Sequence, residues 1–431
     1  MSRPIDRSRP LVDVERAIIV CVSLADDPIE PEDALDELRS LAEASGASVV
    51  AELRQNRRYP DRATCLGSGR VGELRDLAVA NESRLVIFGC DLTPAQGVNL
   101  EKQLGLRVID RSQLIMDLFA VRARTHQARL QVELAQLEYS LPRLKRMWTH
   151  LDRYKGGIGM RGPGETQLEL DRREIEKKIS DRRRRIAEIE RAHALRREGR
   201  SDRFTVGLIG YTNAGKSTLF NILTRSNELS ENRPFTTLDT KTSTWRPAVG
   251  CTVLLSDTVG FVRDLPHHLI ASFHATLQEA LEADLLLHVV DGARPDSHVL
   301  ISAVEEVLAQ VGAADRPRLL VVNKVDAVRD PAILARFGAA ALHLSARSAK
   351  GLDELARRVA AAATADARSI CVRLPHEEGA RIAAVRASAS VESMKSDDLA
   401  VWIRARASAR LAGQLSRFIV PDECFPQDLA P

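Results

Sequence analysis

The chain has 431 residues, of which 44% are hydrophobic and 28% charged, and its formal net charge is +3 at pH 7. This length is enough for about two to four globular domains. There is no run of about 18 apolar residues that could cross a membrane, and the opening MSRPIDRSRP lacks the apolar core of a secretory signal. We therefore expect a soluble, cytoplasmic protein that is not embedded in a membrane. We also expect a monomer.

The cysteines and the charges are distributed differently. The six cysteines lack the spacing of a metal site or a disulfide framework, and we expect reduced thiols. Basic residues are concentrated at 121–200, which holds 21 Lys and Arg against 12 Asp and Glu. A localised cationic stripe is typical of proteins that bind a phosphate backbone. A solvated helix face with many salt bridges has the same composition, so charge alone leaves both interpretations open.

We expect a flexible tail at 1–16, and residues 17–110 alternate strand-like and helix-like segments. The runs AIIVCVS, ASVVAEL, RLVIFG and LRVID predict strands. The helices between them are expected at 31–45, 69–81 and 93–104. This alternation indicates a small parallel α/β domain.

The run GSGRVG at 67–72 matches the dinucleotide-binding fingerprint in form. That fingerprint should close the first strand of its unit, whereas this copy follows the second strand across a polar loop. We favour a turn that leads into a helix, with a second nucleotide site as the alternative.

Residues 111–200 are predicted to form an antiparallel helical hairpin. Its first apolar stripe has alternating spacings of four and three residues, as in a coiled-coil seam, and comprises Leu130, Leu134, Leu137, Leu141, Leu144 and Trp148. Pro142 should kink this helix. The second stripe comprises Leu168, Ile175, Ile179, Ile186 and Ile189. Antiparallel helices need only about two to five residues to turn, so the glycine-rich loop at 155–164 is longer than the connection requires.

Residues 201–366 carry a phosphate-binding motif. The run FTVGLIGYTNAGKSTLFNIL reads as a strand, a P-loop and a helix, which is the context this motif requires. The expected nucleotide contacts are Gly210, Tyr211, Thr212, Asn213, Ala214, Gly215, Lys216, Ser217 and Thr218. Backbone amides at the helix N-terminus would hold the β-phosphate, Lys216 would reach the β and γ oxygens, and Ser217 would bind Mg²⁺.

Three further motifs identify the nucleotide. VLLSDTVGF places Asp257 at a strand end, where its carboxylate can hold the Mg²⁺ shell, and Gly260 where its amide can meet the γ-phosphate; Thr258 and Val259 lie between them. In LLVVNKVD, Asn323, Lys324 and Val325 precede Asp326, whose carboxylate can accept both guanine N–H groups. LHLSAR adds Ser345, Ala346 and Arg347 beside the base. The ligand is therefore expected to be GTP or GDP, not ATP.

The segment NRPFTTLDTKT is the expected switch, in which a threonine closes over Mg²⁺ when the γ-phosphate is present. Its nucleotide-contacting residues are predicted to be Phe235, Thr236, Thr237, Leu238 and Asp239, with Thr237 as the metal ligand. We assign catalytic roles to Lys216, Thr237 and Gly260.

One catalytic group is missing. Phe261 occupies the position at which Ras-like switches carry the glutamine that orients the attacking water, so intrinsic hydrolysis should be slow. Asn213 is either a ligand that helps to hold K⁺ near the phosphates or an ordinary loop residue. His267, His268 and His274 have no companion ligand and are expected to be surface or packing residues rather than a metal site.

Together, GGIGMRGPGETQLE, GYTNAGKSTLFN, FTTLD, DTVGFVRDLP, HATLQEA and NKVD resemble the HflX family of ribosome-associated GTPases over about residues 17–365. The resemblance implies an N-terminal α/β domain and hairpin that dock on the large ribosomal subunit, a Ras-like G domain, and a role in splitting stalled or stress-arrested 70S ribosomes. Thr240 replaces a proline of the family pattern TLDPT, which bears on switch rigidity rather than on Mg²⁺ binding.

Since the nucleotide has its own site, the glycine-rich loop is free to contact something else. Glycines let backbone approach RNA closely, arginine can pair with phosphate or stack on a base, and flanking arginines make the affinity sensitive to salt. The predicted RNA contacts are Gly156, Gly157, Gly159, Arg161, Gly162, Gly164, Arg172 and Arg173. A flexible turn is the alternative for the loop. For the whole chain, the alternatives are a ribosome-assembly GTPase and a regulator that binds proteins without RNA.

Residues 367–431 are expected to form a small α+β domain. SICVRLP and DLAVWIRARAS are its strand-like runs, with a helix-like stretch between them. The predicted fold class is thus a multidomain α/β protein with a hairpin and an α+β C-terminal domain.

Overall fold

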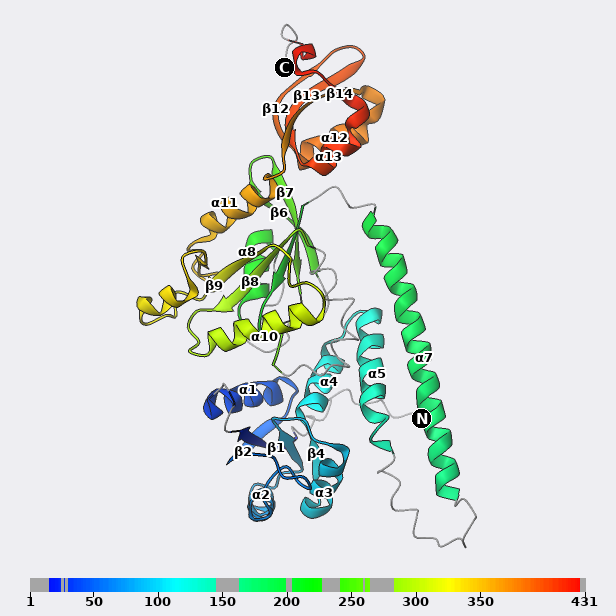
Figure 1. Cartoon of the computed structure of the whole chain (residues 1–431), viewed down its shortest axis with the longest axis vertical. Helices are drawn as coiled ribbons and strands as arrows, with labels where there is room; N and C mark the ends of the chain where they lie inside the picture. The colour runs from blue at the N-terminus through cyan, green and yellow to red at the C-terminus, as the bar shows by residue number, and fades with distance from the viewer. Residues whose placement is uncertain are drawn as a thin grey trace, which may run out of the picture. The chain divides into compact units, whose positions relative to one another are not determined.

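The computed structural model describes residues 15–24, 27, 30–144, 163–198, 204–226, 241–258, 260–263 and 283–426 (Figure 1). These residues contain one parallel, one mixed and one antiparallel sheet. The predicted multidomain α/β fold class is therefore confirmed. The chain divides into two compact units, the first containing the parallel sheet and the second containing the other two. The domain limits given above stay a prediction.

The N-terminal sheet consists of parallel strands in the order β2-β1-β3-β4. They are β1 (Arg16–Leu24), β2 (Ser48–Arg57), β3 (Leu85–Phe88) and β4 (Arg107–Ile109). The connecting helices are α1 (Pro31–Ala44), α2 (Ser68–Ala80) and α3 (Pro94–Leu104). Each lies within a few residues of its predicted range, which confirms the parallel α/β domain.

Helices cover both faces of this sheet. Leu74 of α2 and Leu100 of α3 pack with Ile18 and Phe88 in one buried cluster. On the other side, α4 (Arg111–Arg122) packs against α1 and β3. The Arg111 guanidinium lies 2.7 Å from a Glu37 carboxylate oxygen, and both side chains are buried.

The glycine-rich run GSGRVG forms the start of α2. Gly67 is the residue that precedes the helix, and its backbone N–H donates to the Gln55 side chain at 3.1 Å. The segment is a turn and a helix start, as favoured above.

The helical hairpin is formed by α5 (His126–Ser140) and α7 (Pro163–Glu198). Helix α5 lies beside α7 (Figure 1), and Arg182 of α7 donates to both carboxylate oxygens of Glu133 at 2.8 Å. The seam buries Leu130, Leu134, Ile179 and Ile186.

Pro142 interrupts the helical stretch: α5 ends at Ser140, the chain turns through residues 141–143, and Leu144 is again helical. A proline cannot supply the N–H that the next helical hydrogen bond requires. Trp148, and the side chain of Leu168, lie outside the described residues.

The second unit contains a sheet in the order β10-β9-β8-β5-β7-β6, in which β6 alone is antiparallel to its neighbour. Its strands are β5 (Phe204–Ile209), β6 (Lys241–Ala248), β7 (Cys251–Asp257), β8 (Leu285–Asp291), β9 (Arg318–Asn323) and β10 (Leu342–His343). The helices are α8 (Lys216–Thr224), α10 (Ser297–Gln310) and α11 (Leu352–Ala363), and the 3-10 helix η1 spans Pro331–Phe337. This is the doubly wound arrangement expected of a Ras-like domain.

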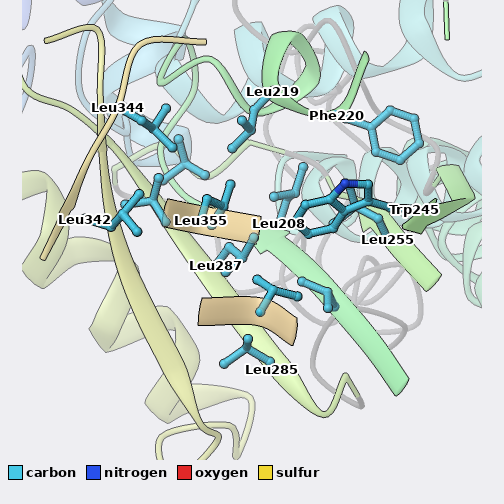
Figure 2. Close-up of a cluster of buried hydrophobic side chains, with 14 of the residues drawn as sticks. Leu208, Leu219, Phe220, Trp245, Leu255, Leu285, Leu287, Leu342, Leu344 and Leu355 are labelled. Carbon is cyan, nitrogen blue, oxygen red and sulfur yellow. The ribbon is translucent and has the colours of Figure 1, made fainter. Parts of the chain in front are cut away.

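Figure 2 shows the core on one face of this sheet, where Leu219 and Phe220 of α8 and Leu355 of α11 meet strand residues such as Leu208 and Leu287. Helix α10 packs against β8 but contributes nothing to this cluster, so it covers the opposite face. Burial on both faces agrees with the continuous apolar runs of these strands.

The C-terminal part forms an antiparallel sheet in the order β12-β13-β11-β14, with two helices that contribute to its core. The strands are β11 (Arg368–Pro375), β12 (Ser390–Ser396), β13 (Ala400–Ala407) and β14 (Ile419–Val420). The helices are α12 (Gly379–Ser388) and α13 (Ala409–Gln414), and short 3-10 helices span His376–Glu378, Ser416–Phe418 and Asp422–Cys424. The expected α+β character is confirmed. Within the described part of the chain, no helix has the length and apolar character needed to span a bilayer.

Replacing Glu37 by glutamine should destabilise the N-terminal domain by about 3–5 kcal/mol, because it leaves the Arg111 guanidinium buried without its charged partner. The matched control is Glu176→Gln, which removes an exposed helical pair with Arg172 and should cost less than about 1 kcal/mol. Urea unfolding followed by circular dichroism measures both. Equal midpoints for the two variants would contradict this account of the buried pair.

Candidate functional site

The P-loop residues 210–215 connect β5 to α8, and the backbone there requires glycine. Gly210 and Gly215 have φ angles of +144° and +93°, which side-chain-bearing residues rarely adopt. A Cβ atom on Gly210 would lie 2.1 Å from the Val289 carbonyl oxygen. The loop is thus pressed against β8, with Thr212 and Ala214 buried and Asn213 exposed at a φ of +61°.

Lys216 begins α8 and is almost fully buried, with 6% of its surface exposed. Its Nζ donates to the carbonyl oxygens of Gly210 at 3.0 Å and Tyr211 at 2.8 Å. Burial lowers the pKa of Lys216 to about 8, an effect that the Asp257 carboxylate partly opposes. A nearby phosphate would favour the charged form and raise this pKa. The carbonyl oxygens of the loop therefore hold the Lys216 amino group beside the expected phosphate position.

The segment that follows β7 forms backbone hydrogen bonds with the P-loop. Phe261 N–H donates to the Gly210 carbonyl at 3.0 Å, and Thr212 N–H donates to the Phe261 carbonyl at 2.8 Å. Phe261 itself is buried. A Cβ atom on Gly260 would lie 3.0 Å from Lys216 Nζ and 2.9 Å from Thr212 Cγ2, so only glycine fits without displacement.

Other groups complete this edge of the sheet. Asp257, at the end of β7, is 1% exposed, and the Thr258 hydroxyl donates to the Leu208 carbonyl at 2.7 Å. Ser217 lies in the first turn of α8. A carboxylate and a hydroxyl at these positions are oxygen ligands of the kind that Mg²⁺ prefers, so these residues fit that ion. Among the described residues, no three His, Cys, Asp or Glu side chains group together as a metal site.

The proposed base-recognition residues meet the P-loop through Asn323, which ends β9. Its amide nitrogen donates to the Ala214 carbonyl at 2.9 Å, and its amide oxygen accepts from the Ala346 N–H at 2.9 Å. Ser345 is fully buried, whereas Asp326 and Arg347 are exposed. Three loops predicted separately from sequence are therefore connected.

Two contacts of the site were not predicted. Lys324, at a φ of +60°, places its Nζ 2.8 Å from the Asp291 carboxylate at the end of β8. Tyr211 Oη accepts from the Arg263 N–H at 3.0 Å, which adds another bond between the P-loop and the segment after β7. Asp291 follows the apolar run LLLHVV, a signal like the one that identified Asp257. The Tyr211 contact has no sequence signal, since it depends on how two loops pack.

Several predicted residues lie outside the described part of the chain. They are the switch residues Phe235, Thr236, Thr237, Leu238 and Asp239, the residue Val259, the loop residues Gly156, Gly157, Gly159, Arg161 and Gly162, and the histidines His267, His268 and His274. Their roles stay predictions. Gly164 lies in the first turn of α7.

The arginines of α7 divide into two groups. Arg182 and Arg183 reach across to Glu133 and Glu138 of α5. Arg172 and Arg173 are exposed, and Arg172 forms an ion pair of 2.8 Å with Glu176 within its own helix. These ion pairs agree with the interpretation of the segment as a helix face with many salt bridges. Binding of a phosphate backbone stays a prediction.

Comparison with family models gives matches along most of the chain. Residues 32–120 match the model described as GTP-binding GTPase N-terminal, residues 122–200 match the GTP-binding GTPase Middle Region, and residues 205–324 match the 50S ribosome-binding GTPase.

Curated relatives are similar over nearly their full length. GTPase HflX of Caldanaerobacter subterraneus subsp. tengcongensis is 38% identical over 95% of this chain and 94% of its own. The Magnetococcus marinus relative of that name is 41% identical over 91% and 93%, and the Escherichia coli one 42% over 85% and 87%. A solved GTP-binding protein of Sulfolobus solfataricus in complex with GDP matches 81% of this chain and 99% of its own at 22% identity, with a TM-score of 0.44.

Gly215→Ala should weaken guanine-nucleotide binding by about 100-fold. The new Cβ would lie 2.2 Å from the Asn323 amide nitrogen, and a left-handed alanine adds about 1–2 kcal/mol of backbone strain. Titration with a fluorescent GDP derivative measures the loss. The control is Gly413→Ala, where a Cβ meets nothing within 4 Å. Wild-type affinity in Gly215→Ala would refute the close contact.

Proposed function

This chain belongs to the HflX family of GTPases, and we propose that it binds the large (50S) ribosomal subunit in the cytoplasm and uses GTP-dependent switching to dissociate stalled or stress-arrested 70S ribosomes. The main support for GTPase activity is that three segments meet near Lys216. They are the P-loop, the segment after β7 and the loop that begins at Asn323. The exposed arginines of α7 and the matched description of a 50S ribosome-binding GTPase support the ribosomal part.

In this proposal the chain hydrolyses GTP to GDP and phosphate. Backbone N–H groups at the start of α8 bind the phosphates, and the Lys216 ammonium neutralises the charge on the β and γ oxygens. Ser217 and Thr237 would hold Mg²⁺ directly, with Asp257 in its shell; when bound, the ion supplies positive charge to the phosphate oxygens. The Gly260 N–H contacts the γ-phosphate, so the segment after β7 responds to the presence of that group.

Intrinsic turnover is slow in this account. Phe261 is a packing residue bonded to the P-loop through its backbone, and its ring cannot orient water as a glutamine does. The ribosome therefore supplies the missing positioning and stimulates hydrolysis. Asn213, exposed at the loop tip, would help to hold K⁺ beside the phosphates.

Guanine selectivity depends on Asp326 in this account. Asp326→Asn should weaken GTP binding by about 100-fold, because hydrogen bonds to a charged group contribute about 1.5–3 kcal/mol each. The same change should improve binding of xanthosine triphosphate, whose C2 carbonyl accepts from an asparagine N–H. Competition against a fluorescent nucleotide measures both affinities. The matched control is Asp315→Asn, at an exposed position; unchanged GTP affinity in Asp326→Asn would exclude this carboxylate from base recognition.

The cationic hairpin is the proposed RNA-binding part. Reversing Arg172 and Arg173 to glutamate should weaken binding to isolated large subunits by about tenfold or more and reduce its salt dependence, since each lost phosphate contact removes counterion release. Co-sedimentation at two salt concentrations measures this.

The control makes the same charge change at Arg316 and Arg357, which are exposed in the second unit. GTP affinity should be unchanged in both double variants. Equal loss of subunit binding in the two would show a general charge effect and would contradict a specific role for α7.

A further inference from the structure

Two cysteines that are 25 residues apart in sequence meet in the N-terminal domain. The Sγ atoms of Cys65 and Cys90 lie 3.7 Å apart. Cys65 is buried at 2% exposure, whereas Cys90 is partly exposed. A disulfide needs its sulfurs about 2.05 Å apart, so a movement of less than about 2 Å would bring these two into bonding distance.

The loop before α2 holds Cys65 in an unusual conformation. Its φ angle is +63°, which is uncommon for a residue with a side chain and persists only where the surroundings enforce it. Cys65 and Asp61 exchange two backbone hydrogen bonds of 3.0 Å, and the Asp61 carbonyl also accepts from the Gln96 side chain at 2.7 Å.

The position of Cys90 is fixed by contacts of its two neighbours in the chain, Gly89 and Asp91. Cys90 follows β3, where the Gly89 N–H donates to the Val20 carbonyl at 2.8 Å. The next residue, Asp91, accepts from the Ser112 hydroxyl at 2.6 Å and so ties this segment to the start of α4. The two sulfurs are thus brought together by two separately anchored loops.

Of the two thiols, Cys65 is the one whose surroundings favour loss of the proton. The hydrogen bond between the two sulfurs, with the Arg57 guanidinium nearby, lowers the pKa of the Cys65 thiol, and burial opposes this effect. The pKa of the Cys90 thiol is raised by the hydrogen bond with Cys65 and by burial. A thiolate is the reactive form of cysteine, and solvent access is needed for the oxidant.

We propose that Cys65 and Cys90 are a reversible dithiol–disulfide site that reacts with a peroxide. One sulfur attacks the peroxide O–O bond, which breaks to give a sulfenic acid and one water. The second sulfur then attacks the sulfenic sulfur, so that an S–S bond forms, the S–O bond breaks, and a second water leaves with the remaining thiol proton. The two thiols lose two electrons, the peroxide gains them, and a dithiol reductant reverses the change.

The sequence does not predict this pair, because the spacing of the two cysteines matches no disulfide or metal-binding pattern. The two loops come together only in the folded domain. The crosslink would connect the segment before α2 to the segment after β3. Since it restricts the unfolded chain, the oxidised protein should unfold at a higher temperature than the reduced protein.

The test uses the full chain, reduced and then treated with hydrogen peroxide in stoichiometric amount. After alkylation of the remaining thiols and digestion without reductant, mass spectrometry should find a peptide linking Cys65 to Cys90, which a dithiol reductant removes. Recovery of both residues as alkylated thiols, or a link from either to another cysteine, would overturn the proposal.

Variants separate this site from general thiol oxidation. Cys424 is exposed and serves as the control. The crosslink should persist in Cys424→Ser and be absent from Cys65→Ser and Cys90→Ser, each of which should lose the rise in unfolding temperature on oxidation. An equal rise in Cys90→Ser would contradict the assignment. If a serine variant fails to fold, peptide mapping of the oxidised wild-type protein still shows whether Cys65 and Cys90 form the disulfide.

Discussion

One amide side chain, that of Asn323, determines how the loops of the nucleotide site fit together. It donates to the P-loop at Ala214 and accepts from the backbone of Ala346. Both bonds are buried, where an unmade hydrogen bond costs about 1–3 kcal/mol, so the phosphate-binding and base-binding segments cannot shift independently. Gly215 makes this possible because a side chain there would overlap the Asn323 amide. A residue assigned by sequence to the base therefore also positions the phosphate loop.

A second set of backbone hydrogen bonds links the P-loop to the segment after β7. Phe261 pairs with Gly210 and Thr212, and Gly260 lies against Lys216. Any movement of Lys216 towards a γ-phosphate must therefore be accommodated by the segment after β7. The buried Phe261 side chain occupies the position predicted for a catalytic glutamine. The proposed dependence of hydrolysis on the ribosome follows from this substitution.

The sequence predicts most of the fold, because apolar runs alternate with amphipathic segments and the P-loop lies between a strand and a helix. The strands and helices of the N-terminal sheet lie within a few residues of their expected limits. Contacts between loops could not be predicted, since the pairs Asn323 with Ala214, Tyr211 with Arg263, and Cys65 with Cys90 depend on packing rather than spacing. At Pro142 the missing N–H breaks the helix through residues 141–143, which is a larger distortion than the expected kink.

The central claim is that the triphosphate state controls binding to ribosomal RNA through a site separate from the nucleotide. The most direct test is a sucrose-gradient profile of purified 70S ribosomes incubated with the protein and either a non-hydrolysable GTP analogue or GDP. The account predicts that the analogue converts 70S ribosomes to free subunits, with the protein in the 50S fraction, and that GDP does not. An unchanged 70S peak with the protein at the top of the gradient in both nucleotides would contradict it.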